Sequence, residues 1–313
     1  MLVRISAVLT FIGLLAACAP APESARDTAR AACEFGPGQS LGDVINSSVF
    51  DGSPTVSRDE TELFFTSDRE GGGDILVSMR PDKSTAWGAP INAGAMINDS
   101  LGGDFSLRLS EDGKTLYFAS NRGGGFGSAD MYVATRASPR ETWARATNMG
   151  PLLNTQAFEA FPTPSADGLT LYFNRSATFD GQDSDMWVTT RASTNDPWGA
   201  PQRVSGDINS ERADFSPSLT ADDKTMYFAS ERAGSLELWV AARADRTQEW
   251  GAAERLAAEV NVARSMTLAP FISSDRRSLY FMSARQDSGT AAACTPTTCF
   301  NRVDLYVATL RCP

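Results

Sequence analysis

Leu116-Tyr117-Phe118 is the best-preserved line of an internal repeat. The same line recurs at four further places: Leu63-Phe64-Phe65, Leu171-Tyr172-Phe173, Met226-Tyr227-Phe228 and Leu279-Tyr280-Phe281. The middle residues are separated by 53, 55, 55 and 53 positions. A period of this length, built from short β signals, is typical of a β-propeller in which each repeat forms one blade.

Each repeat supplies signals for four strands. An acidic residue followed by alternating small and apolar residues, as in Asp51–Ser57, predicts the first strand, and an Asp-Gly turn such as Asp112-Gly113 predicts the hairpin that follows it. The aromatic triplet is the second strand, and lines such as Asp130–Val133 are the third. We expect the fourth strand to begin near a tryptophan that stands eleven residues before an asparagine, as in Trp87 and Asn98, Trp143 and Asn154, Trp198 and Asn209, and Trp250 and Asn261.

The two ends of the chain complement each other. The segment Phe35–Asn46 copies the tryptophan-to-asparagine part of the repeat, with the same interval, but it precedes the first full repeat. The fifth repeat stops at Leu310–Pro313, where its fourth strand is due. The N-terminal segment therefore completes the last blade and removes open sheet edges. The sequence predicts an all-β, five-bladed propeller spanning residues 33–313.

The cysteines agree with this closure. Cys33 stands just before the strand that closes the ring, and Cys312 just after the strand with which it should pair, so we predict a disulfide between them. The remaining pair, Cys294 and Cys299, is predicted to form a second, local disulfide within the long loop of blade five. A metal site is the weaker interpretation, because the chain has no histidine to complete one.

The first residues carry a targeting signal. Arg4 precedes an apolar run, Ile5–Ala17, that is too short to span a bilayer and suits the core of a signal peptide. It ends at Leu15-Ala16-Ala17-Cys18, which resembles the bacterial lipobox. This resemblance implies a signal peptide at 1–17, lipidation of Cys18, a flexible tether over 18–32, and a location on the periplasmic side of the outer membrane, held by the lipid anchor only. Ordinary signal peptidase cleavage is the alternative.

Composition excludes several functions. The formal net charge of −10 disfavours nucleic acid as a partner. Because the chain contains no histidine, Ser-His-Asp and Cys-His nucleophile pairs, an imidazole general base and histidine-ligated metals are all excluded. We expect no cofactor, and catalysis would have to depend on carboxylates, lysine, tyrosine or a bound cation.

The repeat resembles a known group. Its acidic-x-x-Pro start, the Leu-Tyr-Phe line followed by Ser-x-Arg, and the Asp-apolar-Tyr-Val-Ala-Thr-Arg line of 130–136 are similar to the WD40-like (PD40) β-propeller repeat of TolB-type periplasmic proteins. The resemblance covers about residues 34–311. It implies a rigid, protein-binding propeller of the cell envelope. TolB proteins themselves have six such units and an additional α/β domain, so the resemblance is partial and does not carry over the translocation role.

Two sets of charged residues recur from repeat to repeat. One set of arginines lies four residues after the triplet phenylalanine: Arg69, Arg122, Arg232 and Arg285, with Ala177 in blade three. We expect each to bridge the acidic residue that opens the first or third strand, which makes blade three the exception. A ligand-facing role is the alternative.

The second set comprises the carboxylates at the start of the innermost strands: Asp51, Asp104, Glu159 and Asp214, replaced by Thr267 in blade five. In five-bladed glycosidases, carboxylates at such positions act as general acid and base in the channel. The simpler interpretations are that they bind backbone amides or hold a cation such as Ca²⁺. We therefore expect no catalytic residues, with a carboxylate-dependent glycoside hydrolase as the alternative from the enzyme class.

Features that occur once are better candidates for binding. The loops between the second and third strands carry Phe126, Phe179 with Asp183, and Phe300, whereas every tryptophan and tyrosine falls on a repeat position that we assign to the core. We expect these loops to share a face with the connections between blades and to form an apolar cluster with an acidic rim. Each phenylalanine could instead fold back onto its own loop. The sequence thus favours a macromolecule-binding scaffold with a protein partner in the envelope, and a carbohydrate- or peptidoglycan-binding module second.

Overall fold

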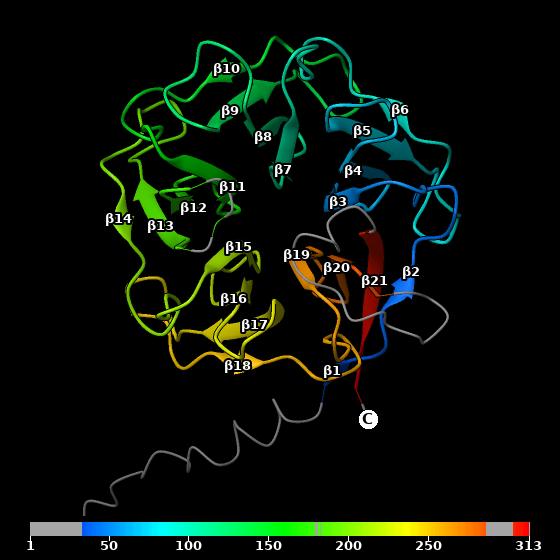
Figure 1. Cartoon of the computed structure of the whole chain (residues 1–313), viewed down its shortest axis with the longest axis vertical. Coiled ribbons are helices and arrows are strands. Elements are labelled where there is room, and N and C mark those ends of the chain that lie inside the picture. The colour runs from blue at the N-terminus through cyan, green and yellow to red at the C-terminus, as the bar shows by residue number, and fades with distance from the viewer. Residues whose placement is uncertain (1–32, 179–180, 182, 286–302, 313) are drawn as a thin grey trace, which may run out of the picture.

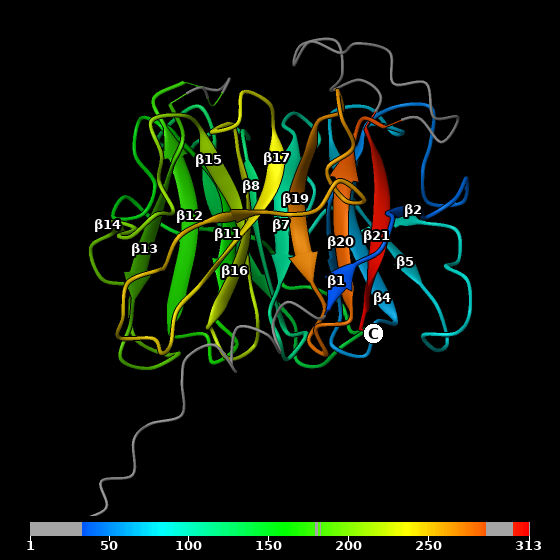
Figure 2. The same ribbon diagram turned by 90° about the horizontal axis from the view of Figure 1, so that it is seen from below.

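Five four-stranded antiparallel sheets stand around a central axis in the computed structural model, which describes residues 33–178, 181, 183–285 and 303–312 (Figure 1). The described residues contain no helix. The predicted five-bladed propeller is therefore confirmed. Viewed from the side, the sheets form a single ring whose strands run between two loop-bearing faces (Figure 2).

Blades one to four have the same order, from the innermost strand outward. Blade one consists of β3 (Asp51–Val56), β4 (Glu62–Ser67), β5 (Asp74–Met79) and β6 (Ile91–Asn92). Blade two consists of β7 (Asp104–Leu109), β8 (Thr115–Ser120), β9 (Asp130–Thr135) and β10 (Thr147–Asn148). Blade three consists of β11 (Phe158–Pro164), β12 (Thr170–Ser176), β13 (Asp185–Thr190) and β14 (Gln202–Arg203). Blade four consists of β15 (Asp214–Leu219), β16 (Thr225–Ser230), β17 (Glu237–Ala242) and β18 (Glu254–Arg255).

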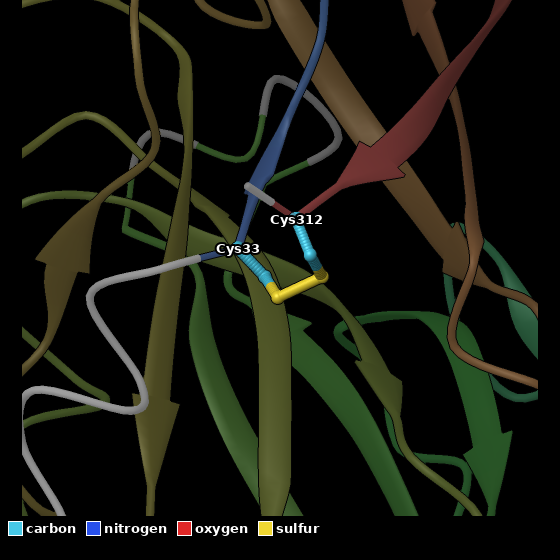
Figure 3. Close-up of a disulfide and its surroundings, with 2 residues drawn as sticks. All are labelled: Cys33 and Cys312. Atoms are coloured by element: carbon cyan, nitrogen blue, oxygen red, sulfur yellow. A yellow bond between two sulfur atoms is a disulfide. The ribbon is translucent and has the colours of Figure 1, made fainter.

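Blade five is assembled from both ends of the chain, as predicted. It consists of β19 (Thr267–Ile272), β20 (Ser278–Ser283) and β21 (Asp304–Arg311), completed by β1 (Glu34–Phe35) and β2 (Gln39–Ser40). Both N-terminal pieces pair antiparallel with β21, in registers that place Phe35 opposite Leu310 and Gln39 opposite Val307. Cys33 and Cys312 form the predicted disulfide just beyond this pairing, with their Cα atoms 4.1 Å apart (Figure 3).

The fourth strands are short. In blades one to four each is only two residues long and begins four residues after its tryptophan, near the predicted position. The repeated asparagine replaces the missing ladder: Asn98 accepts a hydrogen bond from the Ile75 amide and donates one to the Ile75 carbonyl, both at 2.9 Å. Equivalent pairs join Asn154 to Met131 and Asn261 to Leu238. One amide side chain thus satisfies backbone groups that a longer strand would have paired.

The core lies within and between the blades. The triplet phenylalanines of the second strands are fully buried, and all tyrosines except the partly buried Tyr227 are buried as well. Each strand-four tryptophan carries an arginine guanidinium over its ring, as with Arg80 over Trp87 at 3.9 Å and Arg243 over Trp250 at 4.2 Å. The aromatic residues at repeat positions therefore serve packing, as predicted.

Every innermost strand contains a β-bulge. The register shifts near the middle of the strand, between Phe105 and Arg108 in blade two for example, and a residue there adopts a left-handed backbone. These residues are Ser53, Ser106, Phe161, Ser216 and Ala269, with φ between 49° and 54°. A bulge bends its strand and redirects the neighbouring side chains. Because all five blades share it, the bulge belongs to the architecture of the channel wall.

Candidate functional site

The carboxylates at the starts of the innermost strands are sealed from solvent. Asp51, Asp104, Glu159 and Asp214 are each 0% exposed. In blade four, Asp214 Oδ1 accepts a hydrogen bond from Arg232 Nη2 at 3.0 Å, and Oδ2 accepts from the Ser210 amide and hydroxyl at 2.5 and 2.7 Å. Asp51 has the same partners in Arg69 and Ser47. Both carboxylate oxygens are therefore already engaged.

Each of these arginines joins two groups. It donates to the strand-start carboxylate of its own blade and to a backbone carbonyl in the connection from the preceding blade. We call this three-part contact the arginine latch. Arg232 Nη2 also donates to the Ile208 carbonyl at 2.6 Å. Its guanidinium lies 5.2 Å from the ring centroids of both Phe228 and Trp239. Arg69 and Arg122 make the same contacts with the Ile45 and Ile97 carbonyls. The predicted bridge to the first-strand acid is present, and it ties each blade to the one before it.

Blade three builds the same latch from different residues. Ala177 stands at the usual arginine position, but Arg175, two residues earlier, donates from Nε to Glu159 Oε1 at 2.8 Å and from Nη2 to the Leu153 carbonyl at 2.9 Å. The longer glutamate matches the displaced arginine. Blade five is the incomplete copy, because Thr267 offers no charge and Arg285 binds the Val260 carbonyl and Ser283 instead. The expectation that blade three would be the exception is therefore wrong: blade three keeps the bridge through Arg175, and blade five, which has no acid at this position, is the blade without it.

Burial raises the pKa of the Asp104 carboxyl, and the hydrogen bonds from Arg122 and from the Asp99 amide partly oppose the rise. A raised carboxyl pKa is what a glycosidase general acid needs. However, Asp104 has no exposed surface, and its two oxygens accept from Arg122 and Asp99. A proton held there cannot reach a bound sugar without breaking the latch.

The central channel contains an arginine that sequence reasoning did not single out. Arg108, from β7, crosses the axis and donates from Nη2 to the Pro217 carbonyl at 3.0 Å and to the Pro270 carbonyl at 3.1 Å. These carbonyls belong to β15 and β19, which face β7 across the centre (Figure 1). The innermost strands therefore surround a basic side chain, while the strand-start acids are paired elsewhere.

The predicted binding loops are only partly described. Phe126 lies in the loop between β8 and β9 and is 46% exposed, so it does not fold back completely. Asp183 is exposed and accepts hydrogen bonds from the Ala177 amide. The Asn121 amide donates to the Gly103 carbonyl, which places this loop beside a connection between blades, as expected. Phe179, Phe300, Cys294, Cys299 and Cys18 lie outside the described residues, so the three-loop cluster, the second disulfide and the lipid anchor stay predictions.

An apolar groove of about 340 Å³ opens between blades one and two. We call it the blade-one groove. Its exposed rim is Met79, Ile91 and Met96, and its floor includes Phe64 and Trp143. A buried, two-pronged ion pair between Arg136 and Glu62, with N–O distances of 3.0 and 2.7 Å, closes one side.

The sequence contained a signal for this groove. In the other blades the residue aligned with Met79 is threonine or alanine, at Thr135, Thr190, Ala242 and Thr309. The residue aligned with Ile91 is polar in every other blade, at Thr147, Gln202, Glu254 and Gln39. Two large apolar residues that depart from the repeat thus stand side by side on the surface of one blade. Such a pair is not needed for blade packing.

Within the described ranges, no group of three or more Asp, Glu, Cys or His side chains is placed to hold a metal ion. In the same part of the chain, no helix has the length and apolar character to span a membrane.

Comparison with known proteins supports the fold but does not identify an activity. The sequence matches no protein-family model and no curated protein. A solved α-L-arabinofuranosidase from Podospora anserina, in complex with cellotriose, is 10% identical and has a TM-score of 0.60 over 89% of this chain and 98% of that one. An α-L-arabinofuranosidase from Lactobacillus brevis is 14% identical, with a TM-score of 0.55 over 86% and 94%. A putative TolB from Agrobacterium tumefaciens is 14% identical, with a TM-score of 0.49 over 90% and 98%. At such identities the likeness to the two arabinofuranosidases shows the fold alone, and the TolB match, whose TM-score is below 0.5, supports no further argument.

Proposed function

We propose that this propeller is a non-catalytic binding protein that holds a protein partner in the cell envelope, where the lipobox-like signal would anchor it. The observation that carries the proposal is the blade-one groove. In it Met79 and Ile91 occupy two repeat positions that the other blades fill with small or polar residues, and their side chains remain 40% and 59% exposed. Exposed apolar side chains cost solvation free energy unless a partner covers them. The exposed Phe126 offers a second contact on the loop face.

The partner is a protein that presents apolar side chains. The groove has room for two or three such side chains, because a buried leucine-sized group takes on the order of 100–150 Å³ at protein packing density. The carbonyls of β5 that extend beyond the short β6 are already paired: the Met79 carbonyl accepts from the Gly88 amide, and the Ile75 carbonyl accepts from the Ala93 amide. The outer edge of the sheet is then only the two residues of β6, which is short for strand addition, so the mode of binding that we propose is side-chain insertion.

The rival hydrolase function needs two accessible carboxylates on either side of a sugar, about 5–10 Å apart. The buried latches and the position of Arg108 in the channel count against it. Incubation with aryl α-L-arabinofuranosides and β-xylosides tests it directly. We expect no hydrolysis above that of an Asp104→Asn control, and a rate lost in that variant would support the hydrolase instead. A carbohydrate-binding module would show saturable binding of envelope glycans that does not depend on the groove.

The test of the binding function is affinity capture from membranes after crosslinking. The groove variant is Met79→Thr/Ile91→Thr, which installs the blade-two residues and so keeps the fold. The control is Leu101→Ser, which removes an apolar side chain that is 95% exposed outside the groove. We expect one protein to be captured by the wild type and the control and lost from the groove variant. Identical capture profiles for all three would remove the groove from the proposal, and a parallel Phe126→Ser variant would then test the loop face.

A further inference from the structure

Blade five differs from the other blades in how its outer strands are linked. In blades one to four the chain runs directly from the third strand into the fourth, as from β5 through residues 80–90 to β6. In blade five the third strand is β21, and the fourth-strand pieces β1 and β2 come from the other end of the chain. The Cys33–Cys312 disulfide joins these pieces to β21. It therefore takes the place of the loop that links the outer strands of the other blades.

Apart from this bridge, residues 33–46 are held to blade five by short contacts. β1 and β2 each pair with β21 over two positions only. Phe35, which is 8% exposed, is the apolar anchor of β1. At the far end of the segment, the Asn46 side chain donates to the Leu305 carbonyl at 3.0 Å and accepts from the Leu305 amide at 2.8 Å. Tension applied at the N-terminal end of the segment would meet the two-residue pairing of β1 first.

The other end of the bridge is attached to a strand that is held much more firmly. All six residues of β20 pair with β21, and β20 pairs in turn with the innermost strand, β19. Leu305, Tyr306 and Ala308 of β21 are at most 1% exposed. Tension delivered to Cys312, directly after β21, is therefore spread over a complete strand pairing inside the blade.

The bridge also lies at the point where external tension would arrive. Cys33 is the residue through which residues 1–32 join the propeller. Figure 3 shows its side chain meeting that of Cys312 between the start of β1 and the end of β21. Under the proposed function, the membrane anchor precedes Cys33 and the partner lies in the blade-one groove. Tension between anchor and partner would then cross the seam between blades five and one.

We propose that the Cys33–Cys312 bridge is a mechanical clamp, which passes tension from the N-terminal segment into β21 and keeps the ring closed while the anchored propeller holds its partner. This inference rests on the proposed function for its setting. Without the bridge, tension would peel residues 33–50 from blade five and then act directly on β3. Blade five would lose its outer strand, and the edge of β21 would become an open sheet edge.

Single-molecule force spectroscopy on the full chain in mild detergent tests the clamp. Handles are attached through azide-bearing residues placed at Ser24, ahead of the propeller, and at Ile91 on the rim of the blade-one groove. The variants are Cys33→Ala/Cys312→Ala and, as the matched control, Cys294→Ala/Cys299→Ala, which keeps the clamp. The control is pulled before and after addition of a dithiol reductant, so that it is compared with the bridge closed and open.

The chain from Cys33 to Phe50 has a contour length of about 6 nm at roughly 3.3–3.6 Å per residue. We expect Cys33→Ala/Cys312→Ala and the reduced control to lengthen by about 4–6 nm in an early step. This step should need no more than half the force of the first step in the oxidised molecules, because forced unfolding is governed by the unfolding rate of the element under load. The oxidised wild type and the oxidised control should lack it.

Equal first-step forces with the bridge closed and open overturn the proposal, and so does an early 4–6 nm step in the oxidised molecules. If Cys33→Ala/Cys312→Ala does not fold, the control before and after reduction decides between the same results. Neither handle is the lipid or the partner. Failure of the clamp therefore leaves the groove proposal standing, and failure of membrane capture does not alter the measured forces.

Discussion

Removing the Cys33–Cys312 disulfide tests how the ring is held shut. The bridge joins residues 279 positions apart, so it constrains nearly the whole unfolded chain. The chain-entropy relation gives a loss of roughly 19 cal/mol/K in the unfolded state for a loop of this size, or ~5–6 kcal/mol at 25 °C, while native bridges usually contribute ~2–5 kcal/mol. The pairing of β1 and β2 with β21 survives in the variant, including the 3.0 Å hydrogen bond from Gly36 to Thr309. We therefore expect Cys33→Ala/Cys312→Ala to fold, with its free energy of unfolding lowered by ~3–5 kcal/mol.

Urea denaturation followed by tryptophan fluorescence measures this loss, with and without a reductant. The control is Cys294→Ala/Cys299→Ala, whose predicted bridge would close a much shorter loop and so contribute less. Reductant should destabilise the wild type and the control variant, and it should leave Cys33→Ala/Cys312→Ala unchanged. A loss below ~1 kcal/mol would refute the argument, because the ring would then be closed by strand pairing alone.

Two further predictions concern buried charges. Burial raises the pKa of Asp223 to about 6, above its ordinary value of 3.8, so between these pH values the folded state binds a proton that the unfolded state does not. The free energy of unfolding should therefore fall by at most ~3 kcal/mol as pH rises from 4 to 6. Urea titrations at several pH values measure this fall, which should be smaller in Asp223→Asn. The same pH dependence in the variant and the wild type would contradict the prediction. In blade three, Arg175→Ser alone should cost ~3–5 kcal/mol by leaving Glu159 buried and unpaired, whereas adding Ala177→Arg and Glu159→Asp should rebuild the standard latch and restore most of the loss. Equal stability of the single and triple variants would show that the latch contributes nothing.

The architecture could be predicted from the sequence because it depends on local, repeated signals. The triplet period set the number of blades, and the misplaced Phe35–Asn46 segment predicted how the ring closes. The length of the fourth strand could not be predicted in this way. There the side chain of Asn98, like its equivalents, makes the hydrogen bonds that a longer fourth strand would have made with the third strand. This substitution is visible only in the folded structure.

The candidate sites were less predictable. The shared position of Arg69 and Asp51 indicated a bridge, but Arg175 is displaced by two residues and acts only because Glu159 is longer than aspartate. Arg108 appears in the sequence as one cation in a strand, and only the folded ring brings it to the carbonyls of Pro217 and Pro270 in two other blades. Alignment of the repeats marks Ile91 as unusual, but whether an apolar residue is buried or exposed depends on how neighbouring blades pack.

The central claim is that the repeated carboxylates hold blades together and perform no chemistry. A double-mutant cycle on Asp214 and Arg232, measured as free energies of unfolding in urea, tests it most directly. We predict that Asp214→Asn and Arg232→Met each lose ~3–5 kcal/mol, and that the double variant loses clearly less than their sum because the pair is coupled. Wild-type stability in Asp214→Asn, together with loss of a glycoside-hydrolysing activity that the wild type possesses, would contradict the account.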